Sequence, residues 1–493
     1  MNLAARLRQR SAEAGWDDLV AFHTPGRGYT HGEVHELAAR AATVLSERGV
    51  GERDRVLIAL SDSIAWVVSF LAVARLGGTA VPVNPALTAD NHRFQMSDSG
   101  AVLMVGEEAL RERASSFLSA QELLSAADSA NAADPVETDG PLYVYYTSGT
   151  TGRPKGVVYG QDSLEVYHDA VGQGAFGITS GDVTLSVSKM YFGYGFNNTF
   201  VFPLHTGSSA VLVEDRPTPE VAQELVTRYG VTLLYSVPSW YARLIAEADA
   251  GAFGSVRAAV SGGEALTADL AGKVGKFLDA PLLNQLGATE VGCAITANTI
   301  HFDRPGSIGK PVGALEVEVR DSSGQPVADG EQGELWVRPV QMTEYLNLPD
   351  ETAAVLQSGW FRTRDLVVRD DDGAFTHFGR ADDMEMVGGI TVAPTEIEAV
   401  LSSHPEVREA GVVAVPDELG QTKLRAFVVT YAPHPPSGLA EELVELARAR
   451  LAPFKVPRSV HTVPGLPRTP SGKLRRYLLR DQAPDLLKGD HDG

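Results

Sequence analysis

Residues 147–156, Thr-Ser-Gly-Thr-Thr-Gly-Arg-Pro-Lys-Gly, decide how the rest of this chain is interpreted. The stretch combines four hydroxyl side chains, three glycines and two cations in ten positions. Glycine lets a backbone approach a ligand closely and turn its N–H groups toward an anion, and the hydroxyls and cations add donors and positive charge. The apolar run 142–146 predicts a buried strand just before it. A strand followed by such a loop predicts phosphate binding.

Two other interpretations of this loop are weaker. It is not a Walker A loop, because no Gly-Lys-Ser/Thr follows a glycine at the required spacing. A flexible Ser/Gly linker is the structural alternative, but a linker would rarely continue directly into Pro154-Lys155-Gly156-Val157-Val158. We therefore interpret residues 147–156 as a phosphate-binding loop.

Length, charge and cysteine content narrow the class of protein. A chain of 493 residues is too long for one hydrophobic core and suggests at least two domains. The net charge of −21 argues against a nucleic-acid partner, whose phosphates would be repelled. The absence of any apolar run near twenty residues predicts no membrane span. A single cysteine, Cys293, and an N-terminal stretch without an apolar h-region lead us to expect a cytoplasmic location.

Hydrophobic patterning predicts two kinds of structure along the chain. A capping box at 30–33 predicts a helix toward Gly49, and strand-like and helix-like stretches then alternate to about residue 260. Such alternation indicates a parallel sheet with helices on both faces. After about residue 310 the pattern becomes apolar–polar alternation broken by turns, which predicts antiparallel hairpins in a small barrel or sheet.

Four further segments carry side chains suited to nucleotide chemistry. Gly287-Ala-Thr-Glu290 places a hydroxyl and a carboxylate beside a glycine, and a carboxylate near a triphosphate is a natural magnesium ligand. Residues 359–365 and 379–383 supply Asp and Arg, which can hold ribose hydroxyls and phosphate oxygens. Residues 470–476 put a lysine on a Ser-Gly turn. Each segment alone could be an ordinary turn or tail, but their order and spacing together are specific.

In this order the segments resemble the adenylate-forming (ANL) superfamily of acyl- and aryl-CoA ligases, luciferases and peptide-synthetase adenylation domains, along essentially the whole chain. Residues 189–198, 212–220, 261–266 and 382–389 resemble benzoate-CoA-ligase-like aryl-CoA ligases in particular. The resemblance implies an α/β fold. A large N-terminal domain, residues 1–380, would consist of stacked βα subdomains plus a small β-barrel and bind ATP and the acyl group. A small mobile α+β lid domain would follow at residues 381–493.

The resemblance also implies a two-step reaction with ATP, Mg2+ and CoA. A benzoate- or cinnamate-like carboxylate would attack the α-phosphorus to give acyl-AMP and pyrophosphate, and the CoA thiol would then displace AMP. Three alternatives remain open: delivery of the acyl group to a carrier-protein thiol, adenylation of nitrite for aryl-amine diazotisation, and a non-catalytic nucleotide-binding interaction protein. The partners expected are a small aromatic acid, ATP and CoA, in a monomer or homodimer.

The catalytic roles are carried over from the family by motif. Lys473 would bridge the carboxylate and the α-phosphate, Thr289 would hold the α-phosphate, and Glu290 would be the metal ligand. Asp382 corresponds to the hinge about which the small domain swings, and Gly388 and Gly389 would then reach the thiol tunnel. The ATP-binding residues implied are Thr147, Ser148, Gly149, Thr150, Thr151, Gly152, Lys155, Gly287, Ala288, Asp365 and Arg380, the last two on the ribose.

The acyl pocket is also placed by resemblance. Phe192 corresponds to the aromatic gate between the acyl site and the thiol tunnel. The pocket residues implied are Phe192, Gly193, Tyr194, Ser261, Gly262 and Gly263. An aromatic cluster interrupted by glycines is more typical of a pocket than of a packed core. Because no basic residue stands ready for a second substrate carboxylate, we expect a monocarboxylic aromatic acid.

Four positions depart from the family pattern. Met386 stands where many members carry a lysine used in the second step, which keeps the non-thiol acceptor open. Leu286 replaces an adenine-stacking tyrosine, and Tyr159 replaces a histidine that often follows the phosphate loop. Arg364 stands at a loop glycine, so that the usual Thr-Gly-Asp becomes Thr-Arg-Asp.

Overall fold

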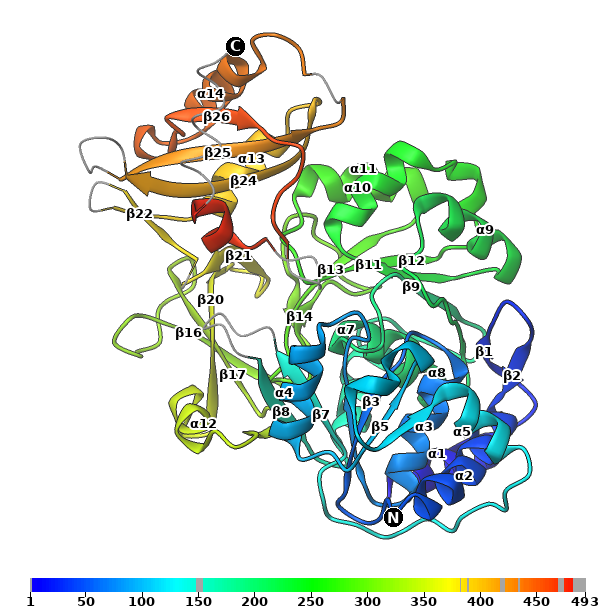
Figure 1. Ribbon diagram of the computed structural model, residues 1–493. Coiled ribbons are helices and arrows are strands. Elements are labelled where there is room, and N and C mark those ends of the chain that lie inside the picture. The colour runs from blue at the N-terminus through cyan, green and yellow to red at the C-terminus, as the bar shows by residue number, and fades with distance from the viewer. Residues whose placement is uncertain are drawn as a thin grey trace.

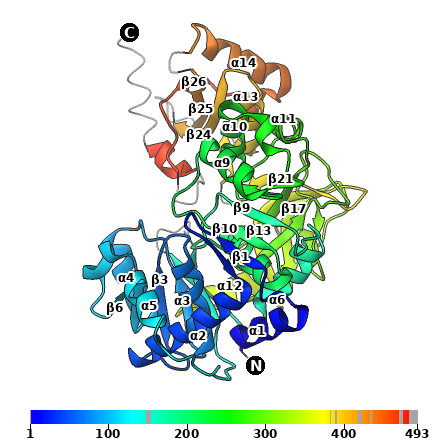
Figure 2. The same ribbon diagram turned by 90° about the vertical axis from the view of Figure 1, so that its right-hand side faces the viewer.

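The structure is a computed structural model that describes residues 2–147, 154–381, 383–387, 390–416, 422–432, 435–468 and 474–481. At residues 293, 386, 390, 391 and 416 only the backbone is described. Figure 1 shows a large unit of layered sheets and helices with a small unit at one end. In Figures 1 and 2 the small unit lies at the opposite end of the molecule from helices α1 (Leu3–Ala14) and α2 (His31–Glu47).

A nine-stranded sheet forms the first layer of the large unit. Its six central strands, from β13 to β1, are parallel, and β15, β14 and β2 add antiparallel edges. In spatial order the strands are β15 (Lys310–Pro311), β14 (Cys293–Ala297), β13 (Leu282–Ala288), β12 (Ala258–Ser261), β11 (Leu233–Ser236), β9 (Val183–Ser186), β10 (Ser209–Val211), β1 (Val20–His23) and β2 (Gly28–Thr30).

A seven-stranded sheet forms the second layer. Strands β7, β4, β3, β5 and β6 are parallel, whereas β7, β8 and β18 pair antiparallel. The order is β18 (Met342–Tyr345), β8 (Lys155–Tyr159), β7 (Tyr143–Thr147), β4 (Thr79–Pro82), β3 (Arg55–Ala59), β5 (Leu103–Gly106) and β6 (Phe117–Ser119). The two sheets confirm the predicted βα alternation.

Helices cover both sheets. Helix α2 begins at the predicted capping box: the Glu33 amide donates to Thr30 Oγ1 at 3.2 Å, and the Thr30 amide donates back to the Glu33 carboxylate at 2.9 Å. Helix α3 (Ile64–Arg75) is almost entirely buried, since it is apolar on all sides. The other helices of the large unit are α4 (Ala89–Ser99), α5 (Ala120–Ala127), α6 (Ser163–Tyr167), α7 (Gly193–Phe196), α8 (Phe202–Thr206), α9 (Pro219–Tyr229), α10 (Pro238–Glu247), α11 (Ala268–Leu278) and α12 (Pro349–Val355).

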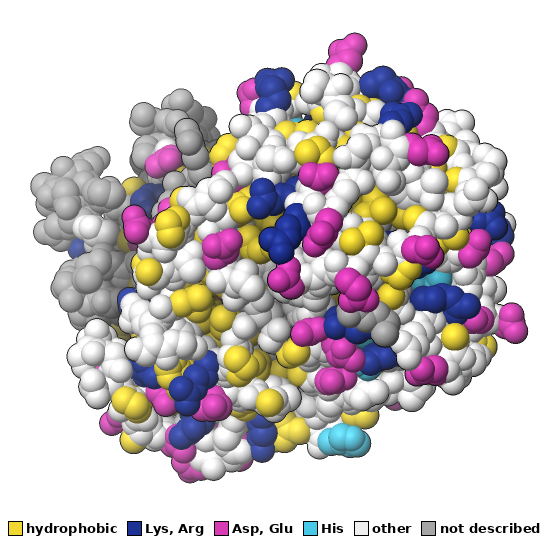
Figure 3. Space-filling view, turned by 90° about the horizontal axis from the view of Figure 1, so that it is seen from below, with side chains coloured by type: hydrophobic (Ala, Val, Ile, Leu, Met, Phe, Trp, Pro, Cys, Tyr) yellow, Lys and Arg dark blue, Asp and Glu magenta, His cyan; other side chains and the backbone are white. Residues whose placement is uncertain are grey.

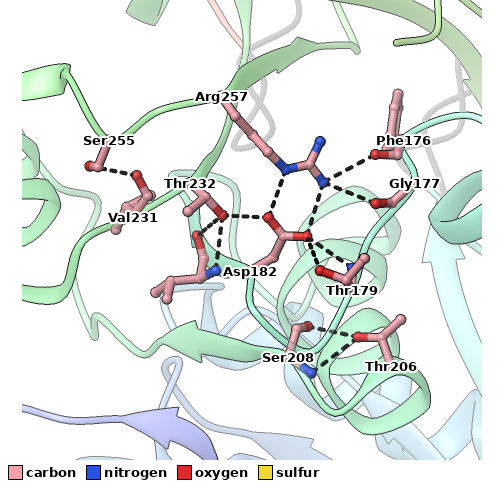
Figure 4. A network of polar contacts seen from close by, with 11 residues as sticks. Phe176, Gly177, Thr179, Asp182, Thr206, Ser208, Val231, Thr232, Ser255 and Arg257 are labelled. Atoms are coloured by element: carbon pink, nitrogen blue, oxygen red, sulfur yellow. Dashed lines mark hydrogen bonds and ion pairs between the residues drawn. The ribbon is translucent and has the colours of Figure 1, made fainter. Parts of the chain in front are cut away.

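A polar network fixes the amino ends of three neighbouring parallel strands (Figure 4). Asp182, Thr232 and Arg257 directly precede β9, β11 and β12. Arg257 Nε donates to Asp182 Oδ1 at 2.7 Å, and the Thr232 hydroxyl donates to the same oxygen at 2.7 Å. The Asp182 carboxyl is buried, which raises its pKa, but hydrogen bonds from Arg257 and the Thr179 amide outweigh burial and lower it overall. The functional site is expected at the opposite, carboxyl ends of these strands.

The predicted hairpin region forms an antiparallel sheet beside the two parallel layers. The strands are β16 (Glu316–Arg320), β17 (Gln332–Arg338), β19 (Leu356–Gln357), β20 (Trp360–Arg369) and β21 (Phe375–Arg380). Strand β20 pairs with β17, β19 and β21, all antiparallel. Strand β16 coincides with the apolar–polar alternation at residues 315–320 of the sequence.

The small unit has its own hydrophobic core, formed mainly by α13, α14 and the sheet β24-β25-β26. Its elements are β22 (Glu385–Val387), β23 (Ile390–Val392), α13 (Pro394–Ser402), β24 (Val407–Pro416), β25 (Thr422–Thr430), α14 (Leu439–Arg450) and β26 (Ser459–Thr462). The predicted fold, a large α/β unit followed by a small α+β unit, is confirmed. The boundary at residue 380 stays a prediction.

Two surface observations complete the fold. In the described part of the chain, no helix is long and apolar enough to span a membrane. On the face seen in Figure 3, Lys and Arg side chains are interspersed with Asp and Glu.

Candidate active site

The predicted phosphate loop connects two antiparallel strands. Thr147 ends β7 and pairs with Lys155 at the start of β8. Five of the residues predicted to bind ATP lie outside the described residues: Ser148, Gly149, Thr150, Thr151 and Gly152. Lys155 forms an ion pair with Glu351 of α12, and its ammonium lies 5.3 Å from the centre of the Tyr345 ring. Lys155 thus stands at the junction of the loop, β18 and α12.

Gly287 and Ala288 end β13, Thr289 and Glu290 follow it, and two tyrosines hold this segment. The Tyr345 hydroxyl donates to Glu290 Oε1 at 2.6 Å, and the Tyr159 hydroxyl donates to the Thr289 carbonyl oxygen. Burial and then the Glu290 carboxylate raise the pKa of Tyr345 above its usual range, so this hydroxyl remains a donor. Gly287 is exposed, and Ala288, Thr289 and Glu290 are partly exposed, which leaves the segment open to a ligand.

Tyr159 explains one departure from the family pattern. It is fully buried on β8, and its ring stacks on Tyr143 at a centroid distance of 4.3 Å. Its hydroxyl reaches the backbone of the segment that carries Thr289 and Glu290. The residue in the usual histidine position therefore joins β8 to the segment expected to hold the metal.

Asp365 and Arg380 lie opposite each other on neighbouring strands, β20 and β21. Asp365 is buried, its amide donates to Thr363 Oγ1 at 3.0 Å, and its Oδ1 lies 3.1 Å from His377 Nε2. The two residues expected on the ribose are therefore brought together, and His377 orients the carboxylate.

Arg364 has a left-handed backbone, with φ of 63°. This conformation favours glycine, which accounts for the family's glycine at this position. The side chain is exposed, and its guanidinium lowers the pKa of Tyr345 against the larger raising effects of burial and Glu290. Arg364 thus adds positive charge close to the Tyr345–Glu290 pair.

The segment 189–194, expected in the acyl pocket, is anchored from several sides. The Met190 amide donates to Asp62 Oδ1 at 2.8 Å, and its carbonyl accepts from the Tyr145 hydroxyl. Lys189 is buried, lies 3.9 Å from Asp62 Oδ2 and donates to the Asp215 carbonyl at 2.6 Å. Burial raises the pKa of Asp62 to about 6, although Lys189 opposes this.

The three residues expected at the acyl group differ in their surroundings. A Cβ at Gly193 would meet no atom within 4 Å, so this position faces open space. The Tyr194 hydroxyl donates to the Val260 carbonyl at 3.0 Å, at the carboxyl end of β12.

Phe192 packs edge-on against Tyr191 at a centroid distance of 4.8 Å. A Cβ at Gly195, within α7, would approach the Lys189 carbonyl oxygen to 2.3 Å, so the close packing of α7 on this backbone requires glycine there.

The segment Ser261–Gly263 lies at the carboxyl end of β12. Gly263 has φ of 86°, and a Cβ at Gly262 would lie 3.3 Å from Gln285 Cγ. Three buried polar atoms in this region have no hydrogen-bond partner within the described part of the chain: Ser236 Oγ, Ser261 Oγ and Gln285 Oε1. The buried amide group of Asn198 also has no partner among the described residues. Buried polar groups are normally paired, so these atoms indicate room for a polar ligand or water.

The prediction that the site binds Mg2+ rests on Glu290. No group of three or more His, Cys, Asp or Glu side chains that could hold a metal occurs among the described residues. Mg2+ is usually bound by one or two carboxylates together with substrate phosphates, so the single carboxylate of Glu290 fits it.

Sequence reasoning missed two residues of this site. Tyr345 is 55 positions from Glu290 and lies on a hairpin strand, and His377 reaches Asp365 only because β20 and β21 pair. The predicted hinge (Asp382), thiol-tunnel residues (Gly388 and Gly389) and catalytic lysine (Lys473) lie outside the described residues. Only the backbone of Met386 is described.

The chain is similar to known proteins along nearly its whole length. The AMP-binding enzyme model matches residues 9–346, and the AMP-binding enzyme C-terminal domain model matches residues 396–473. The p-hydroxybenzoic acid–AMP ligase FadD22 of Mycobacterium marinum is 38% identical over 98% of this chain and 69% of the relative. The 4-hydroxybenzoate–CoA/benzoate–CoA ligase of Rhodopseudomonas palustris is 32% identical over 97% of this chain and 94% of the relative.

A solved structure agrees with these similarities. The benzoate CoA ligase from Burkholderia xenovorans LB400 superposes with a TM-score of 0.89 at 30% identity, covering 97% of this chain and 100% of that one.

Proposed function

Because the chain belongs to the AMP-binding enzyme family, we propose that it activates an aryl carboxylic acid with ATP and transfers the acyl group to the thiol of CoA. The observation that carries this proposal is the hydrogen bond from Tyr345 to Glu290. It joins the strand paired with the phosphate-loop hairpin to the segment that carries Thr289 and Glu290. The Lys155 ammonium, at the start of β8, lies 5.3 Å from the centre of the same Tyr345 ring, which supports a phosphate site near Glu290.

In the first step, a carboxylate oxygen attacks the α-phosphorus and pyrophosphate leaves. Thr289 holds the α-phosphate, Lys155 and the hairpin loop hold the leaving pyrophosphate, and Lys473 neutralises charge between the two reacting groups. Asp365, oriented by His377, binds the ribose with Arg380. Such preorganised charges act most strongly on a phosphoryl-transfer transition state. When bound, Mg2+ on Glu290 would offset the charge of the phosphates.

In the second step, the thiol sulfur attacks the acyl carbon, AMP leaves with the former carboxylate oxygen, and the thiol proton passes to solvent. We place the hinge at Asp382 and the thiol tunnel at Gly388 and Gly389. Rotation of the unit after residue 380 withdraws Lys473 between the steps. The requirement for ATP and CoA supports a cytoplasmic location.

For the acid, we propose a benzoate that carries a polar ring substituent such as a hydroxyl. Relatives are named for p-hydroxybenzoic acid, 4-hydroxybenzoate and benzoate. The space beside Gly193, where an added Cβ would meet no atom within 4 Å, supports a ring at this position. The buried Asn198 amide, which has no hydrogen-bond partner among the described residues, can pair with a hydroxyl. A site built to hydrogen-bond a substrate hydroxyl discriminates strongly against analogues that lack it.

A carrier-protein thiol is the second candidate acceptor. The relatives at 38–39% identity are named AMP ligases, whereas those at 30–32% are named CoA ligases. Both proposals, transfer to CoA and transfer to a carrier protein, begin with the same adenylation. They differ only in the thiol that accepts the acyl group in the second step.

A substrate panel tests the proposal. The protein is incubated with MgATP and each of benzoate, 3- and 4-hydroxybenzoate, cinnamate and hexanoate, with and without CoA. Pyrophosphate release reports adenylation, and mass spectrometry reports the thioester. We expect both with a hydroxybenzoate. Pyrophosphate without a CoA thioester would favour the carrier-protein acceptor, and no pyrophosphate with any aryl acid would reject the proposal.

A further inference from the structure

Glu264 is a poorly solvated carboxylate in the loop that follows β12. Its side chain is 13% exposed and accepts hydrogen bonds from the Ser239 amide and hydroxyl, both at 3.1 Å. Burial raises its pKa, and the nearby guanidinium of Arg468 is the largest influence in the opposite direction. A buried carboxylate needs a cation, and here the cation comes from the small unit.

Arg468 is presented to Glu264 by a second carboxylate. Its Nη2 and Nε donate to Glu409 Oε2 of β24 at 2.8 and 3.2 Å, and its Nη1 lies 3.5 Å from Glu264 Oε1. Because Glu409 holds one side of the planar guanidinium, the opposite side is directed across the boundary between the two units. The series Ser239, Glu264, Arg468 and Glu409 therefore connects α10 of the large unit to β24 of the small unit.

The position of this contact relates it to catalysis. Glu264 follows Ser261–Gly263 at the carboxyl ends of the parallel strands, where the acyl pocket is expected. Arg468 precedes Lys473 by five residues, a stretch of chain that reaches at most about 17 Å. Another contact between the units, Thr395 Oγ1 to the Phe378 carbonyl at 2.8 Å, lies close to the expected hinge and constrains orientation less.

We propose that the Glu264–Arg468 ion pair is the positioning contact that holds the small domain in its adenylation orientation, with Lys473 delivered to the acyl and phosphate site. The pair must break before the second step, when the domain rotates. Glu264 and Arg468 thus act through Lys473. The effect that we expect on the rates of the two half-reactions rests on the proposed function.

The first test separates the two half-reactions. Glu264→Gln removes the charge, while the new amide oxygen can still accept from the Ser239 amide and the new NH2 can donate to the Ser239 hydroxyl. Arg468→Ala removes the cation. We expect each to slow aryl-acid-dependent ATP–pyrophosphate exchange about tenfold, as a corresponding shift in domain population would. Thioester formation from synthetic aryl-adenylate and CoA should stay within about twofold of wild type. Arg468→Lys should recover part of the exchange rate.

Lys455→Ala is the matched control, because it removes a cation from the small unit whose partner, Glu396, is in the same unit. It should change neither half-reaction. The double variant Glu264→Gln/Arg468→Ala should be no slower than either single variant, since both remove one interaction. Additive losses, equal losses in both half-reactions, or unchanged exchange in folded variants would each overturn the proposal.

A second experiment reports the orientation of the two units without requiring catalysis: single-molecule energy transfer between a donor and an acceptor dye. The dyes are attached at Glu108→Cys and Glu445→Cys, whose native side chains are about two-thirds exposed, in a Cys293→Ser background. Arg468→Ala should reduce the population with the wild-type transfer efficiency, whereas Lys455→Ala should not. An unchanged distribution would overturn the positioning role. A shifted distribution in a protein that activates no aryl acid would leave the domain contact standing and reject the proposed function alone.

Discussion

The Tyr345 hydroxyl lies 2.6 Å from Glu290 Oε1, which ties β18 to the segment expected to bind magnesium. A hydrogen bond to a charged group contributes about 1.5–3 kcal/mol. We therefore predict that Tyr345→Phe lowers kcat/KM for MgATP about tenfold or more, because Glu290 loses the donor that fixes its orientation. Tyr431→Phe, at an exposed tyrosine in the small unit, is the control. Unchanged kinetics in Tyr345→Phe would show that Glu290 is positioned by other groups.

Arg364→Gly separates backbone strain from charge. The left-handed backbone at φ of 63° costs a non-glycine residue about 1 kcal/mol, so the variant should unfold at higher urea concentration. The loss of positive charge near Tyr345 and Glu290 should raise KM for ATP several-fold. Urea unfolding and ATP titration measure the two effects. A variant that is destabilised, with KM unchanged, would contradict both assignments.

The Asp182–Arg257 network predicts a pH-dependent contribution to stability. The pKa of Asp182 is lowered in the folded state, so its contribution is present above the unfolded pKa of about 3.9 and is lost as pH falls through the folded pKa. Arg257→Ala should reduce the free energy of unfolding at pH 7 by on the order of 2–3 kcal/mol. The difference from wild type should shrink below about pH 4.

Urea titrations across this pH range measure the effect. Arg243→Ala, which removes an exposed helical pair with Glu247, should cost less than about 0.5 kcal/mol. A pH-independent loss in Arg257→Ala would mean that packing, and not the Asp182 carboxylate, carries the stabilisation.

Lys473→Ala tests the role implied by resemblance. Removal of one preorganised charge at a phosphoryl-transfer site costs about 3–5 kcal/mol, so adenylation should fall several hundred-fold or more. Thioester formation from synthetic aryl-adenylate and CoA should survive. If both half-reactions fall equally, one lysine does not serve the first step alone, and the domain-rotation account fails.

The sequence predicted much of the fold because its signals are local. The capping box at Thr30 and Glu33, and the alternation in β16 and β17, depend on neighbouring residues and appear where expected. For the region after residue 310, the patterning alone left a barrel or a sheet open and the resemblance implied a small β-barrel. The described strands there form an antiparallel sheet. Closure of such strands depends on long-range pairing, which periodicity does not encode.

The candidate site was predicted as motifs and not as contacts. Tyr345 has no motif, and its link to Glu290 exists only because β18 pairs with β8. His377 meets Asp365 through a shifted register between β20 and β21, which no spacing in the sequence reveals. Arg364 had no explanation until its left-handed backbone was seen.

One measurement tests the central claim most directly. The protein is incubated with MgATP, CoA and 4-hydroxybenzoate labelled with 18O in both carboxylate oxygens, and the products are weighed by mass spectrometry. Attack on the α-phosphorus transfers one labelled oxygen, so the account predicts AMP that carries one 18O atom, unlabelled pyrophosphate and a thioester that keeps the other label. ADP with labelled phosphate, or AMP without label, would contradict it.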